Sequence, residues 1–322
     1  MDEAIGAARH VVAAARPLAY GGRRREIALE LASDCGGVVH RATLALHGID
    51  RFGVRNEVES GRWFKVGRHT VAIGTPELGE VALRWRAVWE SGSGSRLDGV
   101  SALVAGGMTG FTPSCIDVSL PARNRHHRVD GVRMHLLRRP APIVGSGIPR
   151  VALEMAMIHA AQWAVSDRQA ALLICLPLQQ RLTSARRIQL AWRGIQRSAR
   201  HEFLETVVAD VTDGAHSLGE LDFARMARRA GLPPPTRQAL RQGPRGRVYL
   251  DVAWDEVGLV VEIDGGHHAL ALNSVDDALR QNDRVAAGES VIRIPVLGLR
   301  LAAAKFMGQV RGTYDRLRRH RS

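Results

Sequence analysis

The stretch from 248 to 268 reads VYLDVAWDEVGLVVEIDGGHH, and it decides which fold the C-terminal part of this chain can adopt. It contains two runs of β-branched and aliphatic residues separated by a short polar turn, a pattern typical of two paired strands. Acidic side chains interrupt these runs at Asp251, Glu262 and Asp264. Because a buried carboxylate is costly unless its charge is compensated, the pattern predicts a metal ion, an arginine or water beside them.

Helix and strand signals on either side of this stretch predict one α/β domain over 214–322. An amphipathic helix over 216–231 precedes the two strands and ends at a glycine, a common C-cap. A helical pattern over 275–288, a strand over 290–297 and a basic terminal helix follow. The element order is therefore α–β–β–α–β–α, and the first two strands carry the acidic residues.

The acidic residues have the spacing Asp251-x10-Glu262-x-Asp264. Side chains two residues apart in a strand project from one face, so Glu262 and Asp264 share a face that Asp251 reaches from the neighbouring strand. Such oxygen ligands suit Mg²⁺ (or Mn²⁺), which lowers the pKa of a bound water and stabilises charge on a scissile phosphate. Asp251 and Glu262 are thus candidate metal ligands; alternatively, Arg280 or Arg293 neutralises them.

Other candidate catalytic residues flank the acidic pair. His267 and His268 follow the second strand directly, and because imidazole titrates near neutral pH, His268 is a candidate general acid or base. Glu220, in the preceding helix, could face the same site. Its alternative role is structural, because Ser217-x-x-Glu220 is a capping box that stabilises a helix start by roughly 1 kcal/mol.

The charge balance predicts a polyanionic partner. The chain of 322 residues has 45 basic and 32 acidic residues, a net charge of +13, and only Lys65 and Lys305 are lysines. Guanidinium groups bind phosphates bidentately, so nucleic acid, and first of all double-stranded DNA, is the expected partner. Signal-peptide and membrane-helix patterns are lacking, and three widely spaced cysteines without zinc spacing indicate reduced thiols and a cytoplasmic protein: Cys35, Cys115 and Cys175.

The first 75 residues predict a winged-helix DNA-binding region. A helical pattern over 26–37 closes on a glycine pair, two short helical patterns separated by HGID follow, and residues 63–74 alternate as in a hairpin. Helix, helix–turn–helix and hairpin is a winged-helix order. The alternative is a small packing domain with a solvated basic face. The candidate nucleic-acid-binding residues are Arg51, Arg55, Lys65 and Arg68.

The middle of the chain, 76–213, predicts an α+β region with a basic loop. Strand-like runs over 115–122 and 132–139 flank the sequence RNRHHRVDG, which includes Arg123 and Arg125. As a hairpin tip, this loop would reach a phosphate backbone. An ordinary exposed loop is the equal alternative.

Residues 183–211 predict one long helix with Thr183 or Ser184 as its cap. Its arginines recur at offsets of 7, 4 and 3, which places them on one stripe. The stripe is either a solvated face or the lining of a nucleic-acid groove. Its members are Arg186, Arg193, Arg197 and Arg200; of these, Arg193 and Arg197 are candidate nucleic-acid-binding residues, as is Arg280 further along the chain.

Taken together, the motifs of residues 214–297 resemble the very-short-patch-repair-like endonucleases of the PD-(D/E)XK group. The shared features are a Ser-x-x-Glu helix start, a Gly-Leu-Pro-x-Pro turn, a strand aspartate, VEIDG-x-HH and an Arg-x-Asn helix before VIRI. The resemblance implies a restriction-endonuclease-like fold, a three-layer α/β domain. The matching residues are Ser217 and Glu220, 231–235, Asp251, 262–268, and 280–282.

The resemblance also implies roles for individual residues. Asp251 becomes the principal metal ligand, with Glu262, Glu220 and a histidine around the site. Two positions depart from the family pattern. Asp264 stands where the classical lysine would be, although relatives of the repair endonuclease use histidines instead, and Gln281 stands where many relatives have an aspartate.

Upstream, residues 26–190 resemble the winged-helix and following region of abortive-infection type IV antitoxins. The expected fold is thus a multidomain α+β and α/β protein, divided at 1–75, 76–213 and 214–322. We expect a DNA-binding, Mg²⁺-dependent endonuclease, with a homodimer left open. The alternatives are a non-catalytic antitoxin-like repressor with a degenerate nuclease fold, and an RNA-directed nuclease.

Overall fold

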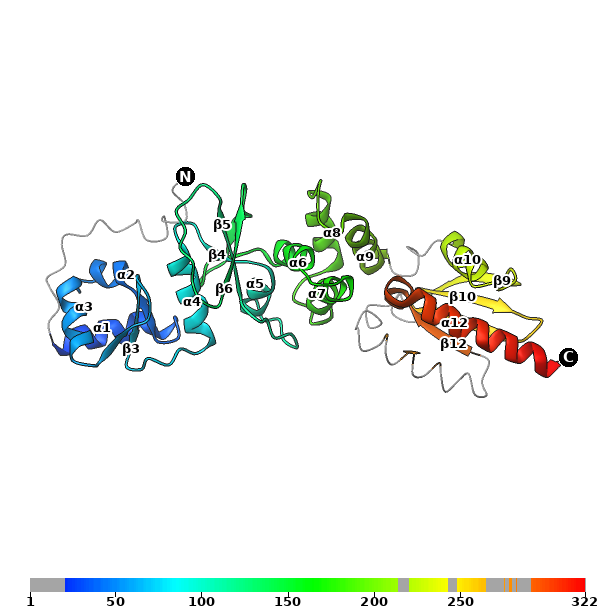
Figure 1. Cartoon of the computed structure of the whole chain (residues 1–322), viewed down its shortest axis with the longest axis horizontal. Coiled ribbons are helices and arrows are strands. Elements are labelled where there is room, and N and C mark those ends of the chain that lie inside the picture. Colours follow the sequence, from blue (N-terminus) through cyan, green and yellow to red (C-terminus); the bar gives the residue numbers. More distant parts are fainter. Residues whose placement is uncertain are drawn as a thin grey trace. The chain divides into compact units, whose positions relative to one another are not determined.

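The computed structural model describes residues 21–213, 220–242, 248–264, 275, 278–279, 282 and 291–321. At 213, 220–222, 237–242, 248–249, 264 and 321 the description covers the backbone only. Two compact units divide the chain, Met1–Ala156 and Met157–Ser322 (Figure 1). The protein is therefore a mixed α and β protein of more than one unit, as its sequence predicts.

Unit 1 begins with a small helical bundle that packs on a three-stranded antiparallel sheet of order β1-β3-β2. Its helices are α1 (Gly22–Ser33), α2 (Arg41–Leu46) and α3 (Arg51–Glu59), and its strands are β1 (Val38–His40), β2 (Trp63–Lys65) and β3 (Thr70–Ile73). The two predicted short helices and the predicted hairpin are present. Strand β1, which the sequence did not predict, completes the sheet.

Local signals start the two short helices. Asp50 caps α3 by accepting a hydrogen bond from the amide of Gly53 at 2.8 Å, and His40 caps α2 through Nδ1, which accepts from the amide of Ala42 at 3.1 Å. Between them, the helices bury one apolar cluster against the sheet. Its fully buried members include Ala28, Leu44, Ile49, Trp63 and Val71.

The rest of unit 1 surrounds a five-stranded mixed sheet of order β6-β5-β4-β8-β7. Its elements are α4 (Glu80–Ser91), β4 (Arg96–Leu97), α5 (Gly99–Ala105), β5 (Ile116–Pro121), β6 (Val132–Leu137), β7 (Ile143–Val144), β8 (Arg150–Val151) and the start of α6 (Leu153–Gln162).

The predicted hairpin over 115–139 is wrong, because β5 and β6 are parallel neighbours. Residues 122–131 therefore return the chain to the start of the next strand instead of forming a tip. This return is held by the end of α4 and the residues after it: the amide of His127 donates to the carbonyl of Ser91 (3.1 Å), and Asn124 Nδ2 donates to the carbonyl of Ser93 (2.9 Å). Arg123 and Arg125 are exposed on it.

Unit 2 begins with several helices, and here a second prediction is wrong. The segment predicted as one helix over 183–211 forms two, α8 (Ala185–Arg193) and α9 (His201–Asp213), after α7 (Asp167–Gln179). Ser184 does cap α8, by accepting from the amide of Arg187. The chain breaks at Gly194, and Arg200 has a φ of 57°. The predicted arginine stripe is therefore wrong, since Arg197 and Arg200 lie in the break.

The C-terminal part of unit 2 is a four-stranded sheet of order β12-β11-β10-β9 with helices against it. The meander β9–β10–β11 is antiparallel, and β12 joins β11 in parallel. The bounds are α10 (Glu220–Arg229), β9 (Arg237–Gln242), β10 (Val248–Trp254), β11 (Leu259–Asp264), β12 (Val291–Pro295) and α12 (Val296–Arg321), which is kinked at Ala302.

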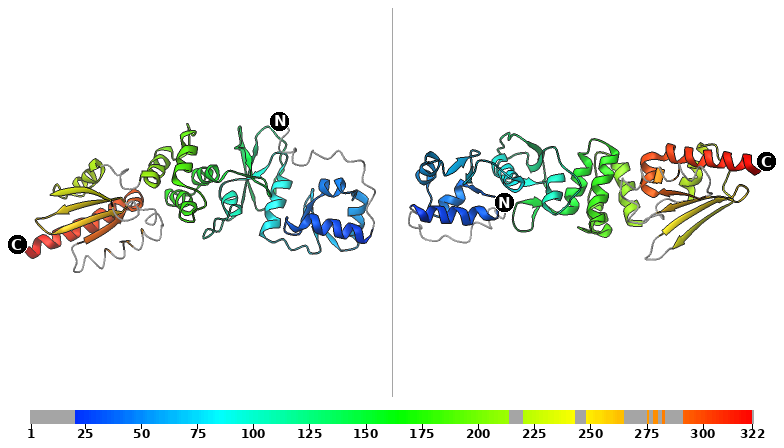
Figure 2. Two further views of the ribbon diagram at one scale, coloured as in Figure 1. Left: turned by 180° about the vertical axis from the view of Figure 1, so that it is seen from behind. Right: turned by 90° about the horizontal axis from the view of Figure 1, so that it is seen from below.

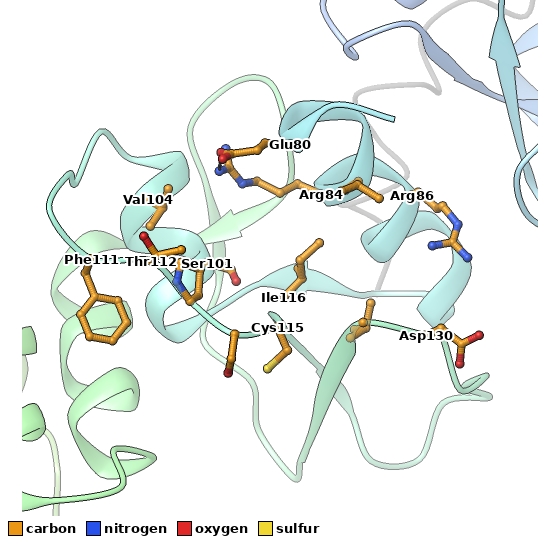
Figure 3. Close-up of a pocket in the computed structure, with 15 residues that line it drawn as sticks. Glu80, Arg84, Arg86, Ser101, Val104, Phe111, Thr112, Cys115, Ile116 and Asp130 are labelled. Atoms are coloured by element: carbon orange, nitrogen blue, oxygen red, sulfur yellow. Dashed lines mark hydrogen bonds and ion pairs between the residues drawn. The ribbon is translucent and has the colours of Figure 1, made fainter. Parts of the chain in front are cut away.

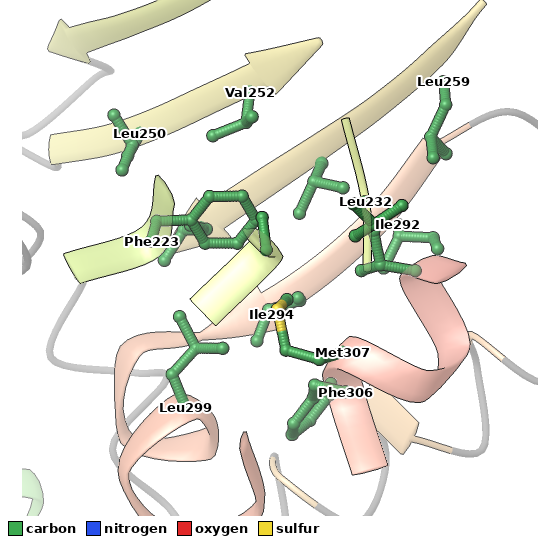
Figure 4. Close-up of a cluster of buried hydrophobic side chains, with 14 of the residues drawn as sticks. Phe223, Leu232, Leu250, Val252, Leu259, Ile292, Ile294, Leu299, Phe306 and Met307 are labelled. Carbon is green, nitrogen blue, oxygen red and sulfur yellow. The ribbon is translucent and has the colours of Figure 1, made fainter. Parts of the chain in front are cut away.

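One face of this sheet forms the core. Helices α10 and α12 lie beside the sheet in Figure 1, and their side chains share one buried cluster with the strands (Figures 2 and 4). Trp254 is fully buried, and its Nε1 donates to the carbonyl of Pro233 at 2.9 Å. Alternation leaves Asp251, Glu262 and Arg293 on the opposite face.

The helices described beside this sheet, α10 and α12, contribute to that one apolar cluster, so the three-layer arrangement stays a prediction. Val275, Ala278, Leu279 and Asn282 are helical, in agreement with the helix predicted over 275–288. Among the described residues, no helix is long and apolar enough to cross a membrane. The three cysteines are free thiols.

Candidate functional site

A basic hollow of about 510 Å³ lies beside α3 in unit 1. Helix α2 contributes Arg41, α3 contributes Arg51 and Arg55, and β2 contributes Lys65. Glu59 is the one acidic residue in the lining. We call this group the basic hollow. Three of its four cationic residues were predicted to bind nucleic acid, and the structure brings them together from elements that are 14 residues apart in sequence, Arg51 to Lys65.

The cationic groups of the basic hollow differ in the contacts that they make within the protein. Arg55 Nε donates to Glu59 Oε1 at 2.7 Å on the exposed surface. The Arg51 guanidinium lies 4.7 Å from the ring centroid of Phe52, which is 56 % exposed. Arg41 has a buried Nε atom without a hydrogen-bond acceptor in the described part of the chain. A buried donor without an acceptor favours an anionic ligand at this position.

The turn between β2 and β3 carries the fourth predicted residue, Arg68, next to but outside the basic hollow. Its side chain is exposed, whereas its backbone is fixed by the buried carboxylate of Glu90 on α4. Glu90 is 6 % exposed and accepts from the amides of Arg68 (2.8 Å) and His69 (2.7 Å) and from Thr70 Oγ1 (2.7 Å). Local sequence patterns contain no signal for this contact, because it joins residues about 20 positions apart.

A second candidate site is the polar row on the C-terminal sheet. Asp251 and Glu262 are direct register partners on antiparallel strands β10 and β11, so both carboxylates leave one face at neighbouring positions. Arg293 is the partner of Glu262 on the parallel strand β12. The register thus confirms that the two predicted acidic residues lie side by side.

An arginine compensates one of these carboxylates. Arg293 Nε donates to Glu262 Oε2 at 2.9 Å, and the side chains are 65 % and 35 % exposed, respectively. The sequence predicted a metal ion, an arginine or water beside the strand carboxylates, and at Glu262 the structure shows an arginine. An ion pair this exposed is worth at most about 1 kcal/mol, so a competing cation or phosphate can separate it.

Asn282 fixes the backbone of the arginine in this row. Its side chain, 1 % exposed, accepts from the amide of Arg293 (3.2 Å) and donates to the carbonyl of Arg293 (3.0 Å), as a further strand would. Gln309 of α12 lies against the same side-chain amide and donates to the carbonyl of Leu279. The Arg-x-Asn motif contained this residue, but its role at the sheet edge is visible only in the fold.

Several predicted site residues fall outside the described side chains. Glu220 is the first residue of α10 and Asp264 ends β11 opposite Pro295, and only their backbones are described. His268, with His267, and Arg280 lie outside the described residues altogether. Arg193 is exposed at the end of α8, and Arg197 is exposed in the break that follows it.

Metal ligands are sparse among the described side chains. These contain no cluster of three or more histidine, cysteine, aspartate or glutamate residues suited to an ion. The two carboxylates of the polar row nevertheless fit the needs of Mg²⁺, which takes one or two protein carboxylates and otherwise keeps its waters. Asp251 and Glu262 are therefore the residues that would hold it.

A pocket of about 320 Å³ lies under α4 in unit 1 (Figure 3). Its lining mixes apolar residues such as Phe111 and Ile116 with the arginines of α4. Both arginines are already used: Arg84 donates to Glu80 (2.6 Å), and Arg86 Nε donates to the carbonyl of Val66 (2.7 Å). Both cationic groups in the lining therefore bond within the protein.

Comparison with known proteins adds little to this geometry. No protein-family model matches the chain, and no curated protein has significant similarity to it. The crystal structure of RV2827C protein from Mycobacterium tuberculosis aligns over 73 % of this chain and 93 % of that chain, with a TM-score of 0.36 and 17 % identity. A likeness at this level says nothing about function, which rests on the residues themselves.

Proposed function

We propose that this protein binds double-stranded DNA through the basic hollow and the adjoining β2–β3 turn of unit 1. The observation that carries the proposal is that four cationic residues line one hollow together with the exposed ring of Phe52: Arg41, Arg51, Arg55 and Lys65. Such a group offers guanidinium forks to phosphates and an apolar contact to a base or sugar. In this proposal α2 and α3 form the helix–turn–helix of a winged helix, and β2 and β3 form its wing.

Salt dependence of DNA binding tests this proposal. Log K for a random duplex, measured by fluorescence anisotropy, should fall linearly with log salt, with a slope of about −0.9 for each phosphate neutralised. Replacing Arg41, Arg51 and Lys65 by alanine should weaken binding and reduce the slope by about one for each phosphate that is no longer neutralised. Arg138→Ala with Arg139→Ala is the matched control, since both residues are exposed in the same unit outside the basic hollow. Equally weakened binding in both variants would contradict the proposal.

A second function, Mg²⁺-dependent hydrolysis of the bound DNA, is favoured by the register pairing of Asp251 with Glu262. A bound ion would supply a water of lowered pKa and neutralise charge on the phosphate. The protein side chains hold and balance that ion: Asp251 and Glu262 as ligands, and Arg293 as the group that neutralises Glu262 before binding. The restriction-endonuclease-like fold, the roles of Glu220, Asp264 and His268, and a cytoplasmic location belong to this proposal.

Metal binding and cleavage are tested separately. Mn²⁺ binding to the full chain, followed by calorimetry, should be weakened at least about tenfold by Asp251→Asn and unchanged by Asp255→Asn, an acidic residue exposed in the turn after β10. Nicking of supercoiled plasmid with Mg²⁺ or Mn²⁺ should follow the same order. DNA binding without nicking by the wild type would leave the alternative, a non-catalytic DNA-binding repressor. A panel of duplex DNA, single strands and RNA decides the substrate.

A further inference from the structure

Helix α4 forms hydrogen bonds to the backbone of the β2–β3 turn of unit 1 through two side chains that lie one helical turn apart, Arg86 and Glu90. Arg86 donates through Nε to the carbonyl of Val66 at the start of the turn (2.7 Å). Glu90 accepts from the amides of Arg68 and His69 at its far side. The α4 side chains thus satisfy backbone groups of both polarities in a turn that carries an exposed arginine.

The contact between Glu90 and the turn requires a glycine at position 67. A Cβ atom on Gly67 would lie 2.3 Å from Glu90 Oε1, so the carboxylate approaches this closely only because residue 67 is glycine. Ring contacts also link the turn to β1 and α4. His69 stacks on His40 at 5.7 Å between centroids, and His40 packs edge-on against Trp89 of α4 at 5.6 Å. The turn is therefore fixed from the sheet and from α4 together.

The burial of the Glu90 carboxylate costs free energy unless hydrogen-bond donors compensate its charge. The carboxylate is 6 % exposed, and no arginine or lysine forms an ion pair with it in the described part of the chain. Its charge is balanced by the two amides and by Thr70 Oγ1. A buried carboxylate satisfied by a turn backbone stabilises one turn conformation and disfavours others, because any other leaves the charge without donors.

We propose that Glu90 and Arg86 are positioning residues that hold the β2–β3 turn so that the Arg68 guanidinium meets a DNA phosphate. This inference rests on the proposed DNA binding of unit 1 and extends it to a helix outside the helix–turn–helix and hairpin. Preorganising one cation saves the conformational entropy of ordering it on binding. Glu90 touches no DNA in this arrangement and acts through Arg68.

The test is a double-mutant cycle on DNA binding of the full chain. Arg68→Ala should weaken binding and reduce the salt slope by about one, as expected for one phosphate contact. Glu90→Gln should weaken binding in the wild-type background and reduce the slope in the same direction. In the Arg68→Ala background, Glu90→Gln should cost less than about twofold, because residues that act as one unit are not additive.

Glu57→Gln provides the matched control. Glu57 is another buried carboxylate of unit 1, 5 % exposed, and lies on α3. It accepts a hydrogen bond from Arg62 Nε at 2.7 Å and has no bond to the β2–β3 turn among the described residues. Its replacement removes a comparable buried charge but should show the same effect on DNA binding with and without Arg68. All binding is measured well below the melting temperature of each variant, so that loss of folded protein does not enter.

The outcomes separate the two proposals. If Glu90→Gln has equal effects with and without Arg68, or none on the salt slope, the positioning role is wrong while DNA binding through the basic hollow stands. If the wild-type chain shows no salt-dependent DNA binding, the proposed function fails first. An amide chemical-shift change at Arg68 and His69 in Glu90→Gln, measured without DNA, reports directly whether the turn is released.

Discussion

Two pairs of strand residues in different units have the same register and different surroundings. Asp117 on β5 is the partner of Arg133 on the parallel strand β6, and Glu262 on β11 is the partner of Arg293 on the parallel strand β12. In both pairs the arginine Nε donates to the carboxylate, at 2.7 Å and 2.9 Å. The carboxylate is 1 % exposed in the first pair and 35 % exposed in the second.

The neighbours of each carboxylate explain what the difference means. Asp117 also accepts from Arg133 Nη2 (3.2 Å) and from His135 Nε2 (2.9 Å), so its oxygens are occupied. Glu262 accepts from Arg293 and lies opposite a second carboxylate, Asp251. The first carboxylate is buried and accepts three hydrogen bonds, whereas the second is partly exposed to solvent. Equal register therefore gives a structural site in unit 1 and a candidate ligand site in unit 2.

Removing the buried carboxylate should have the largest effect. Asp117→Asn leaves Arg133 and His135 without their charged acceptor, and we expect unit 1 to lose about 2–3 kcal/mol of unfolding free energy. With a urea m-value of roughly 2 kcal/mol/M, the unit 1 transition should move by about 1 M, measured by circular dichroism. A shift below about 0.2 M would make the two pairs equivalent and remove the contrast between them.

Asn282 tests whether the second pair depends on a fixed backbone. Asn282→Ala leaves the amide and carbonyl of Arg293 without their partners, and we expect a loss of roughly 1–2 kcal/mol in unit 2. Asn282→Asp is the informative control, because it keeps the acceptor for the amide and removes the donor to the carbonyl. If both variants unfold like wild type in urea, Arg293 is held by other contacts.

Glu90 extends the comparison to a third carboxylate, one held by backbone amides. Burial by itself raises the pKa of the Glu90 carboxyl, but the bonds from Thr70, His69 and Arg68 outweigh it and hold the pKa below its ordinary value of 4.5. A lowered folded-state pKa means that this stabilisation is present above the unfolded pKa and is lost as pH falls through the folded one.

The pH dependence of Glu90→Gln checks that sign. Wild type should be more stable than the variant by about 1 kcal/mol at about pH 7, and the difference should shrink as the pH falls below 4.5, the ordinary pKa of the carboxyl group. Thermal unfolding of both proteins across this range measures it. A difference that grows on acidification would mean that the turn does not stabilise the ionised carboxylate.

The exposed pair should give the smallest change in stability. Glu262→Gln and Arg293→Ala are each expected to shift unfolding by less than about 1 kcal/mol, because the pair is largely screened by solvent. Their effects on Mn²⁺ binding should be opposite, with Arg293→Ala tightening it and Glu262→Gln weakening it. Weaker Mn²⁺ binding in both variants would show that Arg293 supports the acidic site and does not compete there.

Local patterns predicted much of this fold. The hairpin of β10 and β11 and the pairing of Asp251 with Glu262 follow from two strand-forming runs joined by a short turn, because a short turn fixes antiparallel register. Helices α2 and α3, the β2–β3 hairpin and the cap at Ser184 likewise lie within single windows of sequence.

Long-range pairing explains the predictions that failed. A run of strand residues does not state the direction of its neighbour, so β5 and β6, with ten residues between them, were predicted as a hairpin and are parallel. The break after α8 is stabilised by Arg200, whose Nε donates to Asp167 at 2.8 Å across 33 positions. No local propensity contains that contact.

The sequence by itself determined which residue types stand side by side in short hairpins and helices, and the strongly basic charge that favours a nucleic-acid partner. Only the tertiary structure decided which charges are compensated: Arg293 reaches Glu262 across 31 positions, Glu90 reaches the β2–β3 turn across about 20, and Arg41 joins Lys65 at one hollow. The reason is that hydrogen bonds and ion pairs depend on distances of a few ångströms, which chain connectivity fixes only between near neighbours.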